Sequence, residues 1–469
     1  MQRTLSAFLA WFIALSAPAQ VTVVDLSARQ QTLEGWGVSL CWWANMCGRW
    51  SNEASLDTLL TWLCSPRHLG YSLFRYNIGG GDDPQWTHCT PHHFGARRGK
   101  GLRAEMEGFQ VAADGAYHWE RDAAQRRVLL RLKQLRPDAQ FEAFSNSPPY
   151  FMTVSGCCAG AQVATDDNLR PDCYEAFAQY LIDVCLHFRD SLGIEFLTLE
   201  PFNEPMTDYW QANGGQEGCH FDVTSQLAFL KVLSPRLSAS GLKTRLSASD
   251  ETSVQQSVRD LEAYLADGDA VEDLWQWNTH SYEATDSARV RLRELASAVG
   301  LRLWQSETGA SGRGLHGNLQ MAQRLIDDMR LLQPTAWMDW QYVEEHGDQW
   351  SLVQSDWQNE EFRRVKNYYV RYHFTHFIRP GYTFLLTDQP QTLAAVSPEG
   401  DEVVIVLVNT VPNHSAPHTL ALQGFQPQRV QAWRTTQHED AAPTDDFAFS
   451  NGQISLSLPP LSIVTLVLR

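Results

Sequence analysis

Residues 195–208 read Glu-Phe-Leu-Thr-Leu-Glu-Pro-Phe-Asn-Glu-Pro-Met-Thr-Asp, and the fold is best deduced from this stretch. Its first half alternates apolar residues as a buried strand does, and Pro201 and Pro205 then interrupt regular structure. Asn203 and Glu204 lie at the interruption. Polar side chains where a strand gives way to a loop are held by rigid structure and are open to a ligand. The stretch therefore predicts a strand followed by either a catalytic acid or a polar turn.

The same strand pattern recurs along most of the chain and alternates with helix-like periodicity. The expected strands are residues 32–37, 72–77, 140–145, 194–199, 244–249, 274–280, 301–306 and 335–342. The expected helices are residues 56–64, 123–135, 174–191, 224–239, 253–266, 287–298, 319–332 and 361–377. This alternation predicts an α/β fold, a (β/α)8 TIM barrel over residues 35–378. A doubly wound sheet is the competing fold, but the Gly79–Gly81 cluster lacks the spacing of a phosphate-binding fingerprint.

The pattern changes after Arg379-Pro380-Gly381. Helical periodicity disappears, and short β-rich runs follow at residues 392–396, 402–409, 419–422, 429–434, 453–458 and 462–468. Residues 21–26 also alternate like a strand. We therefore expect an antiparallel β-sandwich side domain, formed by residues 20–34 and 379–469.

The amino-acid composition limits the kinds of ligand that the protein is expected to bind. The 469 residues carry a formal net charge of -17, which disfavours nucleic acid or another polyanion as a partner. The 17 Trp, 14 Tyr and 21 Phe suit a polysaccharide or oligosaccharide, because sugar faces stack on aromatic rings. The sequence leaves the oligomeric state open.

The first residues resemble an export signal. Arg3 precedes an apolar run over residues 5–15, and Ala17-Pro18-Ala19 is typical of a cleavage site. Residues 1–19 are therefore predicted to be a cleaved signal peptide, and the protein to be secreted or periplasmic. A membrane anchor is the alternative, but the run is short for a bilayer, so no stable membrane insertion is expected.

The nine cysteines all lie in the first half of the chain. Because an exported protein meets an oxidising compartment, some of them are expected to form disulfides, and the odd number leaves at least one thiol. A zinc site is the alternative, but the usual ligand spacings are missing. No metal site is expected.

Two carboxylates are predicted to face each other across the barrel mouth. Active sites of such barrels lie at the carboxyl ends of the strands, where the fourth strand delivers Glu204 and the seventh delivers Glu307. Glycoside hydrolysis needs such a pair, one carboxyl group protonated and the other ionised. Arg75 and Tyr282 are expected to stabilise the ionised Glu307, and Asn203 to bind a sugar hydroxyl.

Other strand-end residues have both a functional and a structural interpretation. The predicted substrate-binding residues are Trp43, Arg75, Asn146, Asn203, His280, Tyr282 and Trp340. Arg75 is alternatively a structural ion-pair partner, His280 a residue that orders its neighbours, and Trp340 a packing residue. Asp250 and Glu251 fit best as a helix cap and a first-turn acid ahead of the helix near Ser253, and Asp82 and Asp83 as loop polar groups.

Five ordered motifs resemble glycoside hydrolase family 30. They are Gln31–Gly37, Phe74–Gly80, Ser145–Met152, Pro201–Pro205 and Trp304–Glu307. The resemblance spans nearly all of the mature chain. It implies a retaining (β/α)8 hydrolase in which Glu204 is the acid/base, Glu307 is the nucleophile, and no cofactor is required.

Residues 146–156 are similar to the endo-β-1,6-galactanase branch of that family. This resemblance implies action on the galactan side chains of arabinogalactan, whereas related branches act on β-1,6-glucan, glucosylceramide or xylan. Two other classes stay open: a non-catalytic carbohydrate-binding protein on the same scaffold, and an isomerase or aldolase. The last needs a metal cluster or a Schiff-base lysine, and no expected strand ends in Lys. Loops around Trp43, Tyr150 and Trp210 are expected to select the sugar.

Overall fold

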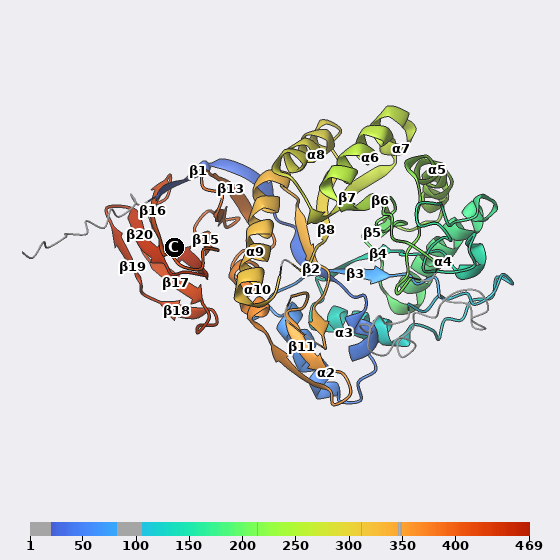
Figure 1. The fold of residues 1–469 in the computed structure, drawn as a ribbon, viewed down its shortest axis with the longest axis horizontal. Helices are drawn as coiled ribbons and strands as arrows, with labels where there is room; N and C mark the ends of the chain where they lie inside the picture. Colours follow the sequence, from blue (N-terminus) through green and yellow to red (C-terminus); the bar gives the residue numbers. More distant parts are fainter. Residues whose placement is uncertain (1–19, 82–105, 213, 311, 346, 348) are drawn as a thin grey trace, which may run out of the picture.

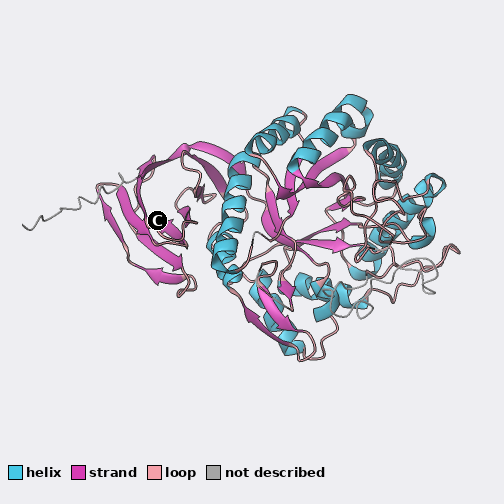
Figure 2. Cartoon of the chain, viewed as in Figure 1, coloured by secondary structure: helices cyan, strands magenta, loops and turns pink. Residues whose placement is uncertain are grey.

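A computed structural model of the chain describes residues 20–81, 106–212, 214–310, 312–345, 347 and 349–469. In this part of the chain, a closed barrel of eight parallel strands with helices around it lies beside a separate, strongly curved sheet (Figures 1 and 2). The predicted signal peptide, Asp82, Asp83 and Cys89 lie outside the described residues. None of the described helices combines the length and the apolar character that crossing a bilayer requires.

The barrel strands follow chain order, and each pairs in parallel with the next until the last closes on the first. They are β2 (Gly35–Ser39), β3 (Leu73–Asn77), β4 (Gln140–Phe144), β5 (Thr198–Glu200), β6 (Arg245–Ser253), β7 (Leu274–Glu283), β8 (Arg302–Glu307) and β9 (Ala336–Asp339). The predicted (β/α)8 barrel is thus confirmed. Several polar residues line its interior as well as apolar ones, and they carry the site described below.

Helices surround the barrel. They are α1 (Trp43–Cys47), α2 (Glu53–Cys64), α3 (Ala123–Leu135), α4 (Tyr174–Leu192), α5 (Val223–Ala239), α6 (Val254–Asp267), α7 (Asp269–Glu272), α8 (Asp286–Ala298), α9 (Gly314–Asp327) and α10 (Lys366–Thr375). Short helical turns occupy Tyr150–Met152, Pro171–Cys173 and Asp328–Leu332. In α4, Phe177, Leu181, Val184 and Phe188 recur at helical spacing and are all buried. The apolar face of this helix is therefore what attaches it to the barrel.

The side domain is one continuous sheet in the order β18-β17-β21-β15-β14-β13-β1-β16-β20-β19. The strands are β1 (Gln20–Thr32), β13 (Thr383–Thr387), β14 (Thr392–Val396), β15 (Val403–Asn409), β16 (Ala416–Gln423), β17 (Val430–Thr435), β18 (Ala442–Thr444), β19 (Phe447–Ser450), β20 (Gln453–Leu458) and β21 (Ser462–Leu468). The sheet curls until β20 faces β15 and β21, which encloses Ile405, Ile454 and Leu466 in a core of its own. Strand β1 pairs antiparallel with β13 but parallel with β16.

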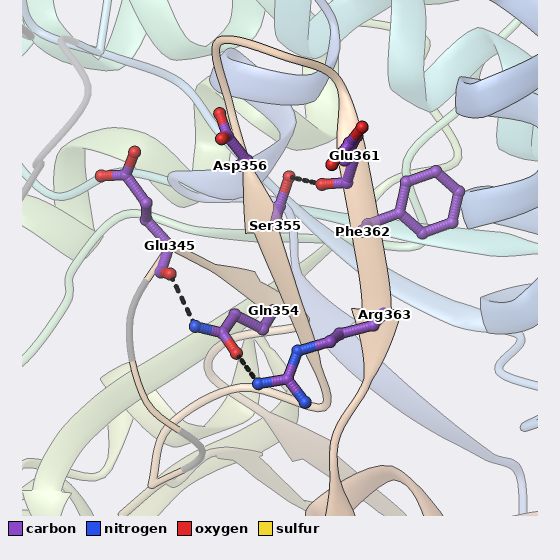
Figure 3. Close-up of a pocket in the computed structure, with 7 residues that line it drawn as sticks. All are labelled: Glu345, Gln354, Ser355, Asp356, Glu361, Phe362 and Arg363. Atoms are coloured by element: carbon purple, nitrogen blue, oxygen red, sulfur yellow. Dashed lines mark hydrogen bonds between the residues drawn. The ribbon is translucent and has the colours of Figure 1, made fainter.

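A small sheet follows β9, formed by β10 (Val343–Glu344), β11 (Val353–Asp356) and β12 (Glu361–Arg364). Its polar face lines a pocket of about 420 Å³, where Gln354 joins the Glu345 carbonyl to Arg363 (Figure 3). Phe362, which also lines this pocket, is partly buried and packs against Trp50 and Trp62. The helix expected at residues 361–377 is therefore wrong at its start, because cross-strand pairing and aromatic packing hold residues 361–364 extended.

The described cysteines also differ from expectation. Cys47, Cys64, Cys185 and Cys219 are buried thiols, and Cys173 is a partly buried one. Burial raises the pKa of Cys64 to about 11, and that of Cys185 to about 12, so both stay protonated. The expected disulfide staples are not formed by these five residues; four of them lie in the main apolar core, and Cys173 packs against it.

Candidate active site

Glu204 lies in the loop that follows β5, and its backbone has φ 50°, in the left-handed region. Such a conformation is costly for a residue with a side chain and persists only where neighbouring contacts impose it. Here the Glu204 N–H donates to the Asp250 carbonyl at 2.9 Å, and its carbonyl accepts from the Trp210 indole at 2.9 Å. These contacts hold the Glu204 side chain inside the barrel mouth, where it is buried.

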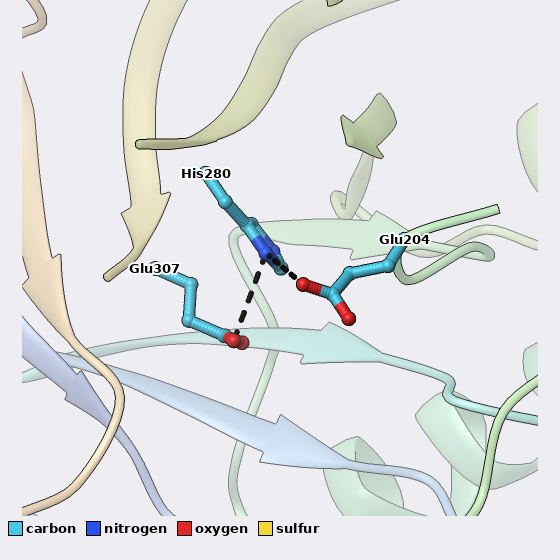
Figure 4. Close-up of side chains that lie close together, drawn as sticks. All are labelled: Glu204, His280 and Glu307. Atoms are coloured by element: carbon cyan, nitrogen blue, oxygen red, sulfur yellow. Dashed lines mark hydrogen bonds and ion pairs between the residues drawn. The ribbon is translucent and has the colours of Figure 1, made fainter. Parts of the chain in front are cut away.

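Glu307 is the last residue of β8, and its side chain meets Glu204 across the mouth. One carboxylate oxygen of each and one ring nitrogen of His280 lie within 4.8 Å of one another. His280 Nδ1 is 3.1 Å from Glu204 Oε1 and 3.6 Å from Glu307 Oε1, so the ring lies between the two carboxylates (Figure 4). The structure thus brings together the pair that the sequence predicted.

Arg75 is the buried cation of the site. From β3, its guanidinium donates to Glu142 at 2.9 Å, to Glu307 at 3.3 Å and to Asp250, while Phe144 packs 4.1 Å from it. Burial opposes its charge, but the surrounding carboxylates raise its pKa. Arg75 therefore forms several ion pairs and also donates a hydrogen bond to Glu307, so its predicted structural role and its predicted role in the site are compatible.

Asp250 was expected to cap a helix, and that expectation is wrong. Strand β6 continues to Ser253, whose own side chain caps α6, and Asp250 points into the barrel instead. There it binds Arg75 and Ser306, and its Oδ1 is 3.2 Å from His280 Nε2. Although burial opposes ionisation, Arg75 and His280 lower the pKa of Asp250 to about 2. Sequence pattern could not reveal this, because an acid before Ser-x-x-Gln also fits a helix start.

His280 is fully buried, and burial alone would keep its ring neutral. The charges of Glu307 and Asp250 outweigh burial and raise the pKa of His280 to about 10. A cation could in principle be bound by Glu204, His280 and Glu307, which present one donor atom each. An imidazolium, however, has no lone pair for a metal, so this site fits a proton on His280 better than a metal ion.

The tyrosine contacts of the two carboxylates differ. Tyr282 donates to Glu307 Oε1 at 2.8 Å, as the sequence predicted, and Tyr209 donates to Glu204 Oε2. Tyr209 was not among the predicted residues, although its position five residues after Glu204 in the same loop was a usable signal. Burial raises the pKa of Glu307 to about 7, with the charge of His280 opposing this rise and that of Glu204 adding to it.

The four remaining predicted residues are two asparagines and two tryptophans. The Asn203 Oδ1 atom is buried and has no hydrogen-bond partner among the described residues, so it can accept from a ligand. Asn146 lies nearby on the loop after β4, where its backbone N–H donates to Asn77. Trp340 is 7% exposed and packs edge-on against Trp42 at 4.9 Å. Trp43 is only 1% exposed, its indole N–H donates to the Ser39 carbonyl, and it packs in the barrel core.

Comparisons with known proteins agree with this geometry. The family described as O-glycosyl hydrolase family 30 matches residues 19–353. An endo-beta-1,6-galactanase of Hypocrea rufa is 31% identical over 405 residues, which cover 82% of this chain and 80% of that protein. An exo-beta-1,6-galactobiohydrolase of Bifidobacterium longum is 25% identical, and the match covers 69% of this chain but 27% of that longer protein.

A solved structure shares the fold. The catalytic domain of the GH30 xylanase C from Talaromyces cellulolyticus superposes with a TM-score of 0.75 at 18% identity, covering 96% of this chain and 100% of that one. With its barrel, its side sheet and its facing carboxylates, the protein is a glycosidase and belongs to glycoside hydrolase family 30.

Proposed function

We propose that the protein hydrolyses glycosidic bonds with retention of configuration, with Glu307 as nucleophile and Glu204 as acid/base. One observation carries this proposal: an oxygen of each carboxyl group lies within 4.8 Å of the other. Retaining glycosidases hold their carboxyl groups about 5–5.5 Å apart, whereas inverting enzymes leave about 6.5–9.5 Å for a water molecule. The short separation favours direct attack by a carboxylate.

The reaction proceeds by double displacement. Glu307 attacks the anomeric carbon, the glycosidic C–O bond breaks, and Glu204 gives its proton to the departing oxygen. Glu204 then takes a proton from water, and the water oxygen displaces Glu307 from the anomeric carbon. The two inversions restore the original configuration, and Glu204 regains the proton that it gave.

The contacts of the two carboxylates support this division of roles. Two carboxyl groups this close share one proton near neutrality, because they cannot both ionise cheaply. Arg75 and Tyr282 both donate to Glu307, which suits the carboxylate that must be ionised to attack. The unpartnered oxygen of Asn203 suits the sugar 2-hydroxyl, a contact that strengthens in the transition state.

Replacement of the nucleophile tests the mechanism. Glu307→Ala should lower kcat at least about 10⁴-fold while the protein stays folded, since the variant lacks the attacking group. Added azide should restore turnover and yield a glycosyl azide of inverted configuration, detected by NMR. The control is Glu262→Ala, at an exposed ion pair on α6. Undiminished hydrolysis by Glu307→Ala would refute the assignment, and a wild type that binds glycans without cleaving them would favour the carbohydrate-binding alternative.

We propose β-1,6-linked galactan, cleaved within the chain, as the substrate. The supports are the relative named endo-beta-1,6-galactanase and the similarity of residues 146–156 to that branch. The second relative is named for exo action on the same linkage, and other members of the family act on β-1,6-glucan, glucosylceramide or xylan. Product analysis on a panel of these four substrates distinguishes them. Oligosaccharides of several lengths from galactan are expected, whereas release of a single uniform product indicates exo action.

We also propose that residues 1–19 are removed on export, leaving a protein that acts outside the cytoplasm. The support is the apolar run that ends at Ala17-Pro18-Ala19. N-terminal sequencing of the protein from culture medium or periplasm should begin at Gln20. A retained leader would contradict this proposal.

A further inference from the structure

Tyr209 belongs to the loop that carries Glu204, and its hydroxyl is the donor to Glu204 Oε2. Glu204 Oε1, the other oxygen, faces His280 at 3.1 Å. Both oxygens of the proposed acid are thus already contacted by protein, one by a buried cation and one by a phenol. A leaving group that receives the Glu204 proton must therefore arrive next to Tyr209 or displace its hydroxyl.

The two ends of the Tyr209 side chain lie in different environments. The hydroxyl is bound in the mouth, yet the residue is 47% exposed, whereas its neighbour Trp210 is 2% exposed. Trp210 packs edge-on against Tyr209 with ring centroids 4.6 Å apart, and the Trp210 indole also donates to the Glu204 carbonyl. The exposed ring is therefore held rigidly by the same residue that fixes the Glu204 backbone.

An exposed aromatic ring fixed beside a proton donor has a defined use in carbohydrate chemistry. Sugars present C–H faces that pack on aromatic planes, and a phenol that donates to a carboxylate fixes its rotamer. We propose that Tyr209 is a positioning residue for Glu204 and that its exposed ring contacts the leaving-group sugar. This inference rests on the proposed function, because it takes Glu204 as the acid/base.

The hydroxyl can serve both half-reactions. When Glu204 is ionised, the Tyr209 O–H donates to it, and when Glu204 is protonated, the phenol oxygen can accept from the acid instead. Burial first, and the charge of Glu204 second, raise the pKa of Tyr209, so the phenol keeps its own proton throughout. The role of Tyr209 is then to orient the acid and not to supply the proton.

The charge state of Glu204 depends on several neighbours besides Tyr209. His280 from β7 favours the ionised form, while carboxylates from adjacent strands oppose it. The groups that face Glu204 are His280, Glu307, Glu251 and Tyr282. A Tyr209 substitution changes none of these four side chains, so a shift in the pH profile is assigned to loss of the phenol.

The hydroxyl is tested with Tyr209→Phe. Without the hydroxyl that donates to it, the ionised form of the proposed acid is less stabilised, so the alkaline limb of kcat/KM should move upward by about one pH unit. The matched control is Tyr369→Phe, a tyrosine on α10 that packs against Tyr368. An unmoved alkaline limb in a folded Tyr209→Phe variant would overturn the positioning role.

A second measurement needs no substrate. Carbon-13 NMR of protein labelled at the glutamate carboxyl groups, with Glu204→Gln to assign the resonance, follows the Glu204 titration directly. The midpoint should be higher in Tyr209→Phe than in the wild type. If the wild type hydrolyses no glycan but this shift appears, the proposed function fails and the contact stands. If hydrolysis occurs without a shift, the proposed contact fails alone.

The ring is tested by comparing leaving groups. Tyr209→Ala should lower kcat/KM on the hydrolysed glycan about tenfold more than Tyr209→Phe does, because only the former loses the stacking face, worth ~1.4 kcal/mol. On a glycosyl fluoride of the same sugar, which has no leaving-group sugar, the two variants should be equal within about twofold. Equal losses for both variants on the glycan, or an equal gap on the fluoride, would overturn the ring contact.

Discussion

The residue with the most consequential environment is His280, a buried ring surrounded by Glu204, Asp250 and Glu307. The carboxylates make it an imidazolium, with its pKa raised to about 10 against the effect of burial. Together with Arg75 it supplies the positive charge that keeps the buried Asp250 carboxylate ionised. His280 therefore acts on the reaction mainly by changing the charge state of the neighbouring carboxylates.

His280→Gln should move the acidic limb of kcat/KM to higher pH by about one unit. The charge of His280 lowers the pKa of Glu307, so its removal leaves burial and Glu204 to raise that pKa further. The acidic limb reports ionisation of the nucleophile in the free enzyme. His187→Gln is the control, since that ring stacks on Trp119 in the shell of the barrel. An unchanged acidic limb in His280→Gln would contradict this assignment.

Trp43 and Trp340 should respond differently to mutation. Trp43→Phe removes the hydrogen bond to Ser39 and creates a gap in the core, so it should lower the free energy of unfolding by about 1–3 kcal/mol. Its KM should match that of the wild type. Trp340→Phe, at the mouth, should raise KM severalfold instead. Urea unfolding and steady-state kinetics on both variants measure these effects, and a raised KM in Trp43→Phe would restore its predicted role in substrate binding.

At the scale of elements, the loop with Glu204 depends on β6 and α6. The Glu251 carboxylate at the end of β6 accepts from the Met206 N–H at 3.3 Å, two residues after Glu204. Asp260 on α6 faces Glu251, and burial with the charge of Asp260 raises the pKa of Glu251. The two acids therefore share a proton, and this pair anchors the loop to the barrel.

Glu251→Gln should flatten the dependence of stability on pH. A carboxyl group whose folded pKa is raised binds its proton more tightly when folded, so stability is lost as pH rises from the ordinary Glu value through the folded pKa. An amide at position 251 donates to Asp260 without a titrating proton. Urea unfolding between about pH 5 and pH 9 should show a smaller loss of stability in Glu251→Gln than in the wild type. Glu262→Gln, at an exposed position on α6, should behave as the wild type. Parallel slopes in all three proteins would contradict the shared proton.

Elements with strong local periodicity could be predicted from the sequence. The expected helix at residues 123–135 coincides with α3, and the barrel strands fall within a few residues of their expected places. The β10–β12 sheet was missed because its strands are short and its pairing is not local. In the site, Glu204 and Glu307 were predictable from their strand ends. The role of Asp250 was not, since its contacts come from elements distant in sequence, and Tyr209 was signalled only by its place in the loop after Glu204.

On the scale of the whole molecule, α10 connects the barrel to the side sheet through His373. Its Nδ1 lies 2.7 Å from the Thr465 hydroxyl and its Nε2 2.9 Å from the Thr435 hydroxyl, on β21 and β17. Burial lowers the pKa of His373 to about 3, so the ring is neutral. The contact between the two parts of the protein thus includes a buried group that resists protonation.

His373→Gln should lower the free energy of unfolding at neutral pH by about 1–3 kcal/mol, because two buried hydroxyls lose their shared partner. Since the folded pKa lies below the ordinary 6.5, the stability from His373 is present above pH 6.5 and is lost as pH falls toward 3. Acid unfolding should therefore be shallower in the variant. His414→Gln, exposed in the loop between β15 and β16, is the control. Identical acid transitions in wild type and His373→Gln would argue against this mechanism.

Strand β1 has a consequence for the order in which the protein forms during synthesis. It leaves the ribosome before any barrel strand, yet its partners β13 and β16 are made only after β9. Each barrel strand pairs with the next along the chain, and only the pairing of β2 with β9 spans the whole barrel, whereas both partners of β1 are made after the barrel. The side sheet therefore closes last, and until it does, the nascent chain carries an exposed strand that chaperones or like chains can bind.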